Sequence, residues 1–126
     1  MSDAIAALLS RAQNELGAAR ILAREGFGAQ ATSRAYYAAF FAAEAALLVL
    51  DETRSKHSAV IAAFGRLVVK DGGLDPAEGA TLRSLFELRN AADYSWLDEP
   101  APADLDAISM AESFVASVAA WISAQG

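Results

Sequence analysis

One stretch of the chain, residues 33–50, constrains the fold more than any other. It reads SRAYYAAFFAAEAALLVL, and Glu44 is its only charged residue after Arg34. A helix that is apolar on nearly every side must be buried on nearly every side, so we expect this segment to be a central helix. It is shorter than the roughly 18–20 uninterrupted apolar residues that span a membrane, and its two charges would be costly in lipid.

The two sides of this helix differ in chemistry. Tyr36 and Phe40 belong to an apolar side of the helix, whereas the other side carries a cation, a phenol and a carboxylate. Polar groups on an otherwise apolar helix predict a polar partner surface elsewhere in the fold. At about 100° per residue, the polar side consists of Arg34, Tyr37, Phe41, Glu44 and Leu48.

Four further segments have apolar residues at helical spacing and recognisable ends. Ser2 and Asp75 are suitable N-caps, and Pro76 stands at the first position of its helix. Glycine-containing breaks follow at residues 26–28 and 71–73. We expect helices over residues 3–25, 29–50, 56–70, 76–94 and 104–123, with a linker at 95–103. The sequence thus predicts a single all-α domain over residues 1–126, an up-and-down bundle of four to five helices.

The charge and the cysteine content exclude several classes of function. A net charge of -6 argues against a broad nucleic-acid-binding surface. Eight of the ten cations are arginine, so a small basic site remains open. The absence of cysteine excludes disulfides and thiolate metal sites. No signal-peptide pattern stands at the N-terminus, and we expect a cytoplasmic protein with no membrane association.

The segment LFELRNAADY, residues 85–94, holds the most informative polar residues. Arg89 and Asp93 form an i,i+4 pair on the side of the helix that also carries Leu82 and Phe86. A buried arginine needs a partner, so we expect Tyr37 on the central helix to contact this pair. The structural alternative is an ion pair that only holds a helix end or a subunit interface.

Three segments together resemble a known family. SRAYYAAFFAAEAALL, KHSAVIAAFGR and LFELRNAADY, in this order, resemble the HEPN domain family over about residues 5–122. The narrower resemblance is to its small stand-alone bacterial branch with an Arg-x-x-x-Asp-Tyr ending. It implies a bundle of four or five helices, commonly a homodimer, often encoded beside a small nucleotidyltransferase in toxin–antitoxin pairs.

The resemblance also implies where catalysis would occur. Catalytic HEPN proteins are metal-independent ribonucleases that use an arginine and a histidine with four to six residues between them, paired across the dimer. Arg89 matches the arginine, but Tyr94 stands five residues later and no histidine follows. A phenol titrates near pH 10, so it cannot replace imidazole as an acid–base group at neutral pH. We therefore expect weak ribonuclease activity or none.

His57 is the only histidine, at the start of the third predicted helix. It could act as a base, or it could simply pack and form a hydrogen bond at the helix start. A single histidine without a second ligand does not make a metal site, so we expect neither a metal nor a cofactor. The candidate catalytic residues are thus Arg89, Tyr94 and His57.

The leading hypothesis is a HEPN-like protein that is non-catalytic or weakly catalytic. It would be the partner of a nucleotidyltransferase or of an RNA-related defence or toxin–antitoxin system. Its polar residues would bind a phosphate-bearing ligand, RNA or a nucleotide, or organise a homodimer. The alternatives are an endoribonuclease with a degenerate motif, Arg89 and Tyr94, and a purely structural dimerisation module. The predicted binding or interface residues are Arg34, Tyr37, Glu44, Arg89, Asp93 and Tyr94. A binding partner would need an exposed apolar patch, and the candidates for it are Trp96, Leu97, Trp121 and Ile122.

Overall fold

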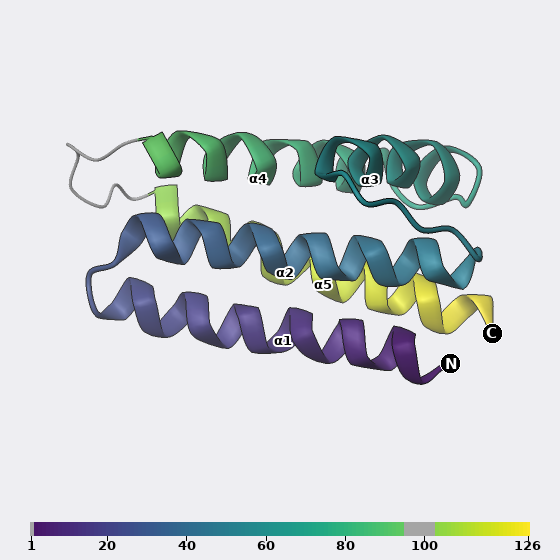
Figure 1. Ribbon diagram of the computed structural model, residues 1–126, viewed down its shortest axis with the longest axis horizontal. Helices are drawn as coiled ribbons and strands as arrows, with labels where there is room; N and C mark the ends of the chain where they lie inside the picture. Colours follow the sequence, from purple (N-terminus) through teal and green to yellow (C-terminus); the bar gives the residue numbers. More distant parts are fainter. Residues whose placement is uncertain (1, 95–102) are drawn as a thin grey trace.

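The computed structural model of the protein describes residues 2–94 and 103–126, and all regular elements in these ranges are helical (Figure 1). The predicted all-α bundle is confirmed. The predicted linker, residues 95–103, lies outside the described residues except for Ala103, the first residue of α5. The elements are α1 (Asp3–Arg24), α2 (Gly28–Val49), α3 (His57–Ala63), the π-helical segment η1 (Phe64–Lys70), α4 (Pro76–Tyr94) and α5 (Ala103–Gln125).

The helix α2 is the centre of the bundle, as its sequence predicts. It contacts α1, α3, η1, α4 and α5. Figure 1 shows α1, α2, α4 and α5 running along the length of the molecule in alternating directions, with both termini at the same end. The shorter α3 and η1 lie beside the first half of α4 and run against its direction.

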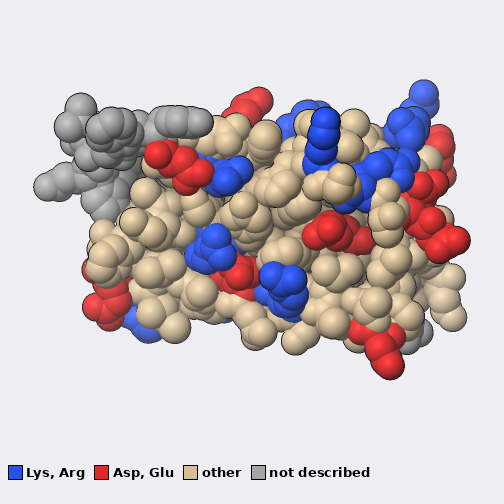
Figure 2. All heavy atoms as spheres, viewed as in Figure 1, with Lys and Arg blue, Asp and Glu red and all other residues tan. Residues whose placement is uncertain are grey.

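Charges of both signs are interspersed on the face of the molecule that Figure 2 shows. Lysine and arginine side chains gather most closely at the upper right, with aspartate and glutamate at the edge of that group, and they stand singly elsewhere. Mixed charges of this kind produce no extended positive potential. On this face, nucleic-acid binding would therefore depend on a local site rather than on a broad basic surface.

Local signals fix most helix ends where the sequence predicts them. The Ser2 hydroxyl accepts a hydrogen bond from the Ile5 amide at 3.2 Å, and the Asp75 carboxylate accepts one from the Ala77 amide at 2.9 Å. Gly26 has φ +88°, a conformation that glycine adopts without strain. The break after α1 covers residues 25–27 and is shifted by one residue from the predicted 26–28, because α1 ends at Arg24 and Gly28 already belongs to α2.

The third predicted helix is not a uniform α-helix. It continues from α3 into η1, and no sequence signal marked this change to wider turns. Immediately after it, the Trp121 indole N–H donates to the Gly72 carbonyl at 2.9 Å. A Cβ at Gly72 would lie 2.5 Å from the Val68 carbonyl oxygen and 2.9 Å from the Trp121 ring. This turn therefore requires glycine for space, where the sequence indicated only a helix stop.

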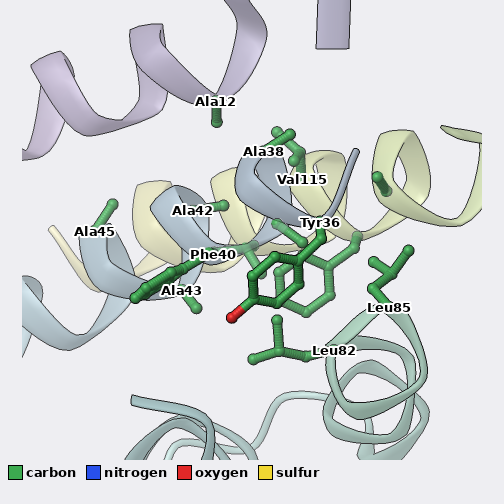
Figure 3. Close-up of a cluster of buried hydrophobic side chains, with 14 of the residues drawn as sticks. Ala12, Tyr36, Ala38, Phe40, Ala42, Ala43, Ala45, Leu82, Leu85 and Val115 are labelled. Atoms are coloured by element: carbon green, nitrogen blue, oxygen red, sulfur yellow. The ribbon is translucent and has the colours of Figure 1, made fainter. Parts of the chain in front are cut away.

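Alanine lets α2 lie close to its neighbours. In Figure 3, Ala38 and Ala42 stand on the side of α2 toward α1 and α5, whereas Tyr36 points toward Leu82 of α4. Small side chains allow helix axes to approach, and each such contact excludes water from both backbones. The fully buried alanines of α2 are Ala31, Ala35, Ala38, Ala39, Ala42, Ala43, Ala45 and Ala46.

Within the described residues, one helix is long and apolar enough to cross a membrane by length and composition alone, namely Leu105–Gln125 of α5. Most of its large apolar residues lie inside the bundle, where α5 packs against α2, α4 and α1, and Leu105 is exposed. Phe114, for example, is fully buried with its ring centroid 5.4 Å from that of Phe64. An apolar helix in the core of a bundle has this composition for packing reasons.

Candidate functional site

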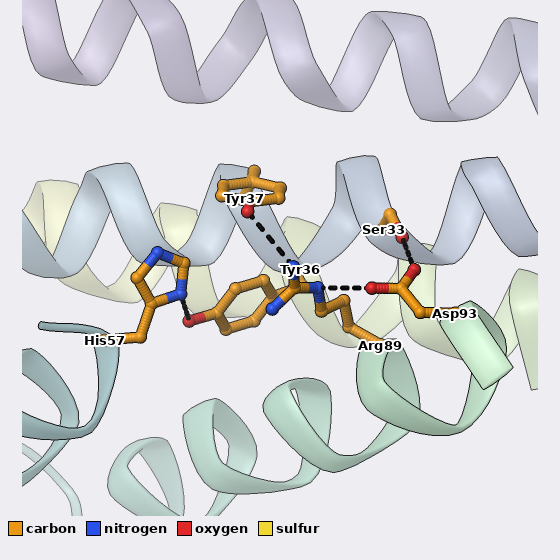
Figure 4. Close-up of polar contacts among 6 residues, drawn as sticks. All are labelled: Ser33, Tyr36, Tyr37, His57, Arg89 and Asp93. Carbon is orange, nitrogen blue, oxygen red and sulfur yellow. Dashed lines mark hydrogen bonds and ion pairs between the residues drawn. The ribbon is translucent and has the colours of Figure 1, made fainter.

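Arg89 projects from α4 toward the tyrosines of α2 (Figure 4). Its Nε atom lies 2.9 Å from Asp93 Oδ2, and one of its terminal nitrogens donates to the Tyr37 hydroxyl across a long 3.4 Å. The guanidinium carbon is 5.5 Å from the Tyr37 ring centroid and 5.7 Å from that of Tyr36, within cation–π range. The predicted contact between Tyr37 and the Arg89–Asp93 pair is therefore present.

The ion pair is more exposed than the helical pattern predicts. The Asp93 side chain is 42% exposed and the Arg89 side chain 25%. The Ser33 hydroxyl of α2 donates to the second carboxylate oxygen of Asp93 at 3.0 Å. The expectation of a pair placed toward the apolar side holds for the arginine and is wrong for the aspartate, because Asp93 is one turn closer to the end of the helix.

His57 joins the same group of residues from the start of α3. Its Nδ1 atom lies 2.9 Å from the hydroxyl of Tyr36, which is fully buried, and its ring centroid is 4.2 Å from that of Phe40. Burial lowers the pKa of His57, and the positive charge of Arg89 lowers it further. The imidazole is therefore neutral at neutral pH and can accept a proton.

Tyr36 is the buried phenol of the site. Burial raises its pKa well above the usual range, and Arg89 offsets only part of this effect. The group is thus a neutral phenol at physiological pH, able to donate or accept one hydrogen bond. We call Ser33, Tyr36, Tyr37, His57, Arg89 and Asp93 the Arg89 cluster.

Arg34 and Glu44 share a helical side with Tyr37, but their contacts lead elsewhere. Arg34 donates to Glu15 of α1 at 3.0 Å and stacks over the Tyr37 ring at 4.8 Å. Burial raises the pKa of Glu44, with the positive charge of Arg11 on α1 acting in the opposite direction. No described contact joins either of them to Arg89 or Asp93. The polar side of α2 is therefore covered by two different helices. Arg34 and Glu44 face α1, whereas Tyr37 faces Arg89 of α4.

Comparison with known proteins identifies the family. The family model described as "HEPN domain" matches residues 5–123. The chain belongs to the HEPN domain family. A protein of Methanocaldococcus jannaschii named "Putative toxin MJ0605" is 36% identical over 114 residues, which cover 90% of this chain and 84% of that protein. A "UPF0332 protein" of Thermotoga maritima is 36% identical over 109 residues, or 86% and 83% of the two chains.

A third relative, "UPF0332 protein glr0978" of Gloeobacter violaceus, is 39% identical over 87 residues, or 69% of each chain. The resemblance that the sequence indicated is thereby shown for the family. The name of the archaeal relative supports a toxin-like HEPN protein, whereas the partner, the ligand and the chemistry remain matters of proposal.

In this HEPN protein, several predicted residues cannot be assigned to the site. The side chain of Tyr94, at the last position of α4, lies outside the described residues, as do Trp96 and Leu97. Trp121 and Ile122 are 8% and 5% exposed, so the prediction of an exposed patch there is wrong. Both lie on the side of α5 that packs into the bundle, where an apolar side chain is more stable.

Two residues of the Arg89 cluster were missing from the predicted site. Tyr36 was assigned to the apolar side of its helix, and its ring is indeed buried, but its hydroxyl reaches His57. Ser33, about one turn earlier on α2, was not among the predicted site residues. The signal available in the sequence was the rule that a buried tyrosine needs a partner for its hydroxyl, which the lone histidine could have satisfied.

Proposed function

We propose that this protein acts in an RNA-related toxin–antitoxin system in the cytoplasm. In this proposal it is a HEPN homodimer that binds a phosphate-bearing ligand, RNA or a nucleotide, through the Arg89 cluster, and a nucleotidyltransferase is its partner. Family membership and the toxin name of the archaeal relative support this class of function.

The observation that carries the proposal is the setting of Arg89. The guanidinium is held against two tyrosine rings, yet a quarter of the side chain is exposed. Its Nε lies 2.9 Å from Asp93 Oδ2 and one terminal nitrogen donates to Tyr37. A guanidinium carries five N–H groups in a planar fork that fits phosphate oxygens. The weak 3.4 Å bond to Tyr37 is the one that an incoming phosphate would most easily replace.

Asp93 limits how strongly an anion can bind there. Its carboxylate lies against Nε and neutralises part of the positive charge. A bound phosphate must therefore compete with this carboxylate, and we expect a modest affinity that decreases as salt increases. The hydroxyls of Ser33 and Tyr37 stand on the same side of α2 and could donate to phosphate oxygens.

One observation favours a second candidate, a metal-independent ribonuclease. His57 is a neutral imidazole within the electrostatic influence of Arg89, and a neutral imidazole is the usual general base. The residue that the family motif would use is absent, so catalysis would depend on His57 from another helix. The Tyr36 hydroxyl on Nδ1 would then orient the ring.

One experiment tests both candidates. Equilibrium binding of a short fluorescent RNA is measured at low and high salt for the wild type, Arg89→Ala and Arg24→Ala. Arg24 is an exposed cation in the last turn of α1, so its variant has the same net charge. We expect Arg89→Ala to weaken binding about 10-fold, the effect of one charge-assisted hydrogen bond, and Arg24→Ala to have little effect.

The same RNA is recovered after incubation with a chelator, and we expect it to be intact. Equal binding by the two variants would contradict the phosphate-binding proposal. Cleavage that is lost in both Arg89→Ala and His57→Asn would favour the ribonuclease instead.

A further inference from the structure

Arg89 is poorly satisfied for a cation that is mostly buried. Its only hydrogen bond to a described residue is the long 3.4 Å contact with the Tyr37 hydroxyl. The Nε atom is buried, and its N–H has no hydrogen-bond acceptor in the described part of the chain, although Asp93 Oδ2 lies 2.9 Å from it. A hydrogen bond weakens steeply when the N–H turns away from the acceptor. The two charges are therefore close without being joined by a directed bond.

Ser33 provides a physical reason for this misalignment. Its hydroxyl donates to Asp93 Oδ1 at 3.0 Å, while the other carboxylate oxygen faces Arg89 (Figure 4). Asp93 stands in the last turn of α4 with 42% of its side chain exposed, so little else restricts the rotation of its carboxylate. Because a carboxylate is planar, fixing one oxygen sets the direction of the other. The Ser33 bond thus holds Oδ2 beside the guanidinium but off the line of the Nε–H bond.

The unpaired Nε–H is the feature that points to a ligand. Buried polar groups are nearly always hydrogen-bonded in folded proteins, and one that is not costs free energy. A carboxylate released from Ser33 could turn and accept this bond, since arginine and carboxylate prefer directed pairs. The present arrangement therefore keeps a charged donor free, and an oxyanion that takes the place of the Asp93 carboxylate would supply the missing acceptor.

We propose that Ser33 is a positioning residue that keeps Arg89 available for an anion. It holds the Asp93 carboxylate off the Nε–H bond, and an arriving phosphate displaces the carboxylate and accepts that bond. The inference rests on the proposed function, because it explains how the phosphate site of the Arg89 cluster stays open. Asp93 is then the internal competitor, and Ser33 determines how strongly it competes.

The first measurement needs no ligand. It follows the Arg89 Nε–H signal by proton–nitrogen NMR, with Arg89→Ala used for assignment. We expect this proton to move downfield in Ser33→Ala, because the released carboxylate then accepts its hydrogen bond. Ser33→Thr retains the hydroxyl and should give the wild-type signal. An unchanged signal in Ser33→Ala would overturn the inference.

The second measurement is the affinity for inorganic phosphate at constant ionic strength, with the unfolding temperature recorded to show that each variant is folded. We expect Ser33→Ala to weaken binding about 10-fold, the effect of one charge-assisted hydrogen bond, and Ser33→Thr to restore it. In an Asp93→Asn background the competing charge is gone, so Ser33→Ala should have little effect. Equal weakening in both backgrounds would make Ser33 a direct donor to phosphate and would overturn the positioning role.

Asp93→Asn alone should tighten phosphate binding about 10-fold, because it removes the competing carboxylate. Glu87→Gln is the matched control, since it neutralises another exposed carboxylate of α4. Glu87 lines a groove between α4 and the α3–η1 segment together with Phe86, and the groove lining includes no residue of the Arg89 cluster. Equal tightening by both variants would reflect net charge alone and would overturn the role of Asp93.

The two measurements separate this inference from the proposed function. If the Nε–H signal moves in Ser33→Ala but no variant binds phosphate through Arg89, the positioning of Asp93 by Ser33 stands and the proposed function fails. If phosphate binding depends on Arg89 but is the same in wild type, Ser33→Ala and Asp93→Asn, the phosphate site stands and the inference is overturned.

Discussion

The two sides of α2 show how one helix serves packing and polar chemistry at once. Toward α1 and α5 it presents small residues such as Ala38 and Ala42, which are fully buried. Toward α3 and α4 it presents the rings of Tyr36 and Phe40, which stack on one another with centroids 5.9 Å apart. These alanines make contacts through shape alone, whereas the aromatic side also needs a partner for the Tyr36 hydroxyl.

This difference between the two sides of α2 indicates which side can hold partly exposed polar groups. Close helix packing leaves no room on the alanine side for a larger side chain or a water molecule. On the aromatic side the large rings hold the helices further apart, so Arg89 and His57 can reach between them. A ligand site therefore belongs on the aromatic side, and three changes probe this contrast.

The largest effect is expected from enlarging the alanine side. Ala38→Leu forces three additional carbons into a site with no exposure, and overpacking of this kind costs about 1–3 kcal/mol. Ala80→Leu on the exposed surface of α4 is the matched control and should change stability little. The free energy of unfolding in urea measures both, and equal values for the two variants would show that α1 and α2 are not packed as described.

A smaller loss is expected from Arg89→Ala on the aromatic side. The variant removes a half-exposed ion pair and two cation–π contacts, together about 1–2 kcal/mol. A fully buried pair would lose about 3–5 kcal/mol on this change, because Asp93 would be left buried and without a partner. Because Asp93 is 42% exposed, water can solvate its carboxylate after the change.

Urea unfolding again gives the value, and Asp93→Ala serves as the complementary variant. A loss above about 3 kcal/mol for Arg89→Ala, the cost of an uncompensated buried charge, would mean that Asp93 is covered, for example by a second copy of the chain.

The smallest effect is a pH dependence that depends on His57. Burial and Arg89 lower the pKa of His57 in the folded state, so the unfolded state takes up the proton first as pH falls. Above the ordinary histidine pKa of about 6.5, His57 is neutral in both states and the free energy of unfolding does not depend on it. As pH falls below this value and through the lower pKa of the folded state, the free energy of unfolding decreases. We expect wild-type stability to decrease more than that of His57→Asn between about pH 7.5 and 5.5.

Glu44 does not affect the difference in pH dependence between wild type and His57→Asn. Its pKa is raised in the folded state, so its contribution has the opposite sign, and it is present in both proteins. Parallel pH profiles for wild type and His57→Asn would place His57 in a more exposed setting than the structure shows.

Much of the fold could be predicted because its signals are local. The cap at Ser2, the proline at the start of α4 and the glycine turns lie at or next to the predicted boundaries. The change from α3 to η1 could not be predicted, because the way in which its residues pack against α2 and α4 is a tertiary matter.

The site was predicted in part. Arg89, Asp93 and Tyr37 were selected correctly as neighbours, since one pair is local and the third residue lies on the only polar side of the central helix. Arg34 and Glu44 were placed in the same group, but a helical wheel cannot show which neighbouring helix covers each part of a side. The prediction that Trp121 is exposed was wrong for a related reason. Its side chain points into the bundle, where the indole N–H donates to the Gly72 carbonyl.

The sequence by itself determined the helices, the central position of α2 and the family. These follow from periodicity, caps and ordered motifs, which are properties of neighbouring residues in the chain. Only the tertiary structure decided that His57 lies against Tyr36, that α1 takes Arg34 away from Arg89, and that a groove opens beside Phe86. Such contacts join residues far apart in the sequence, and they depend on how large and small side chains set the distance between helices.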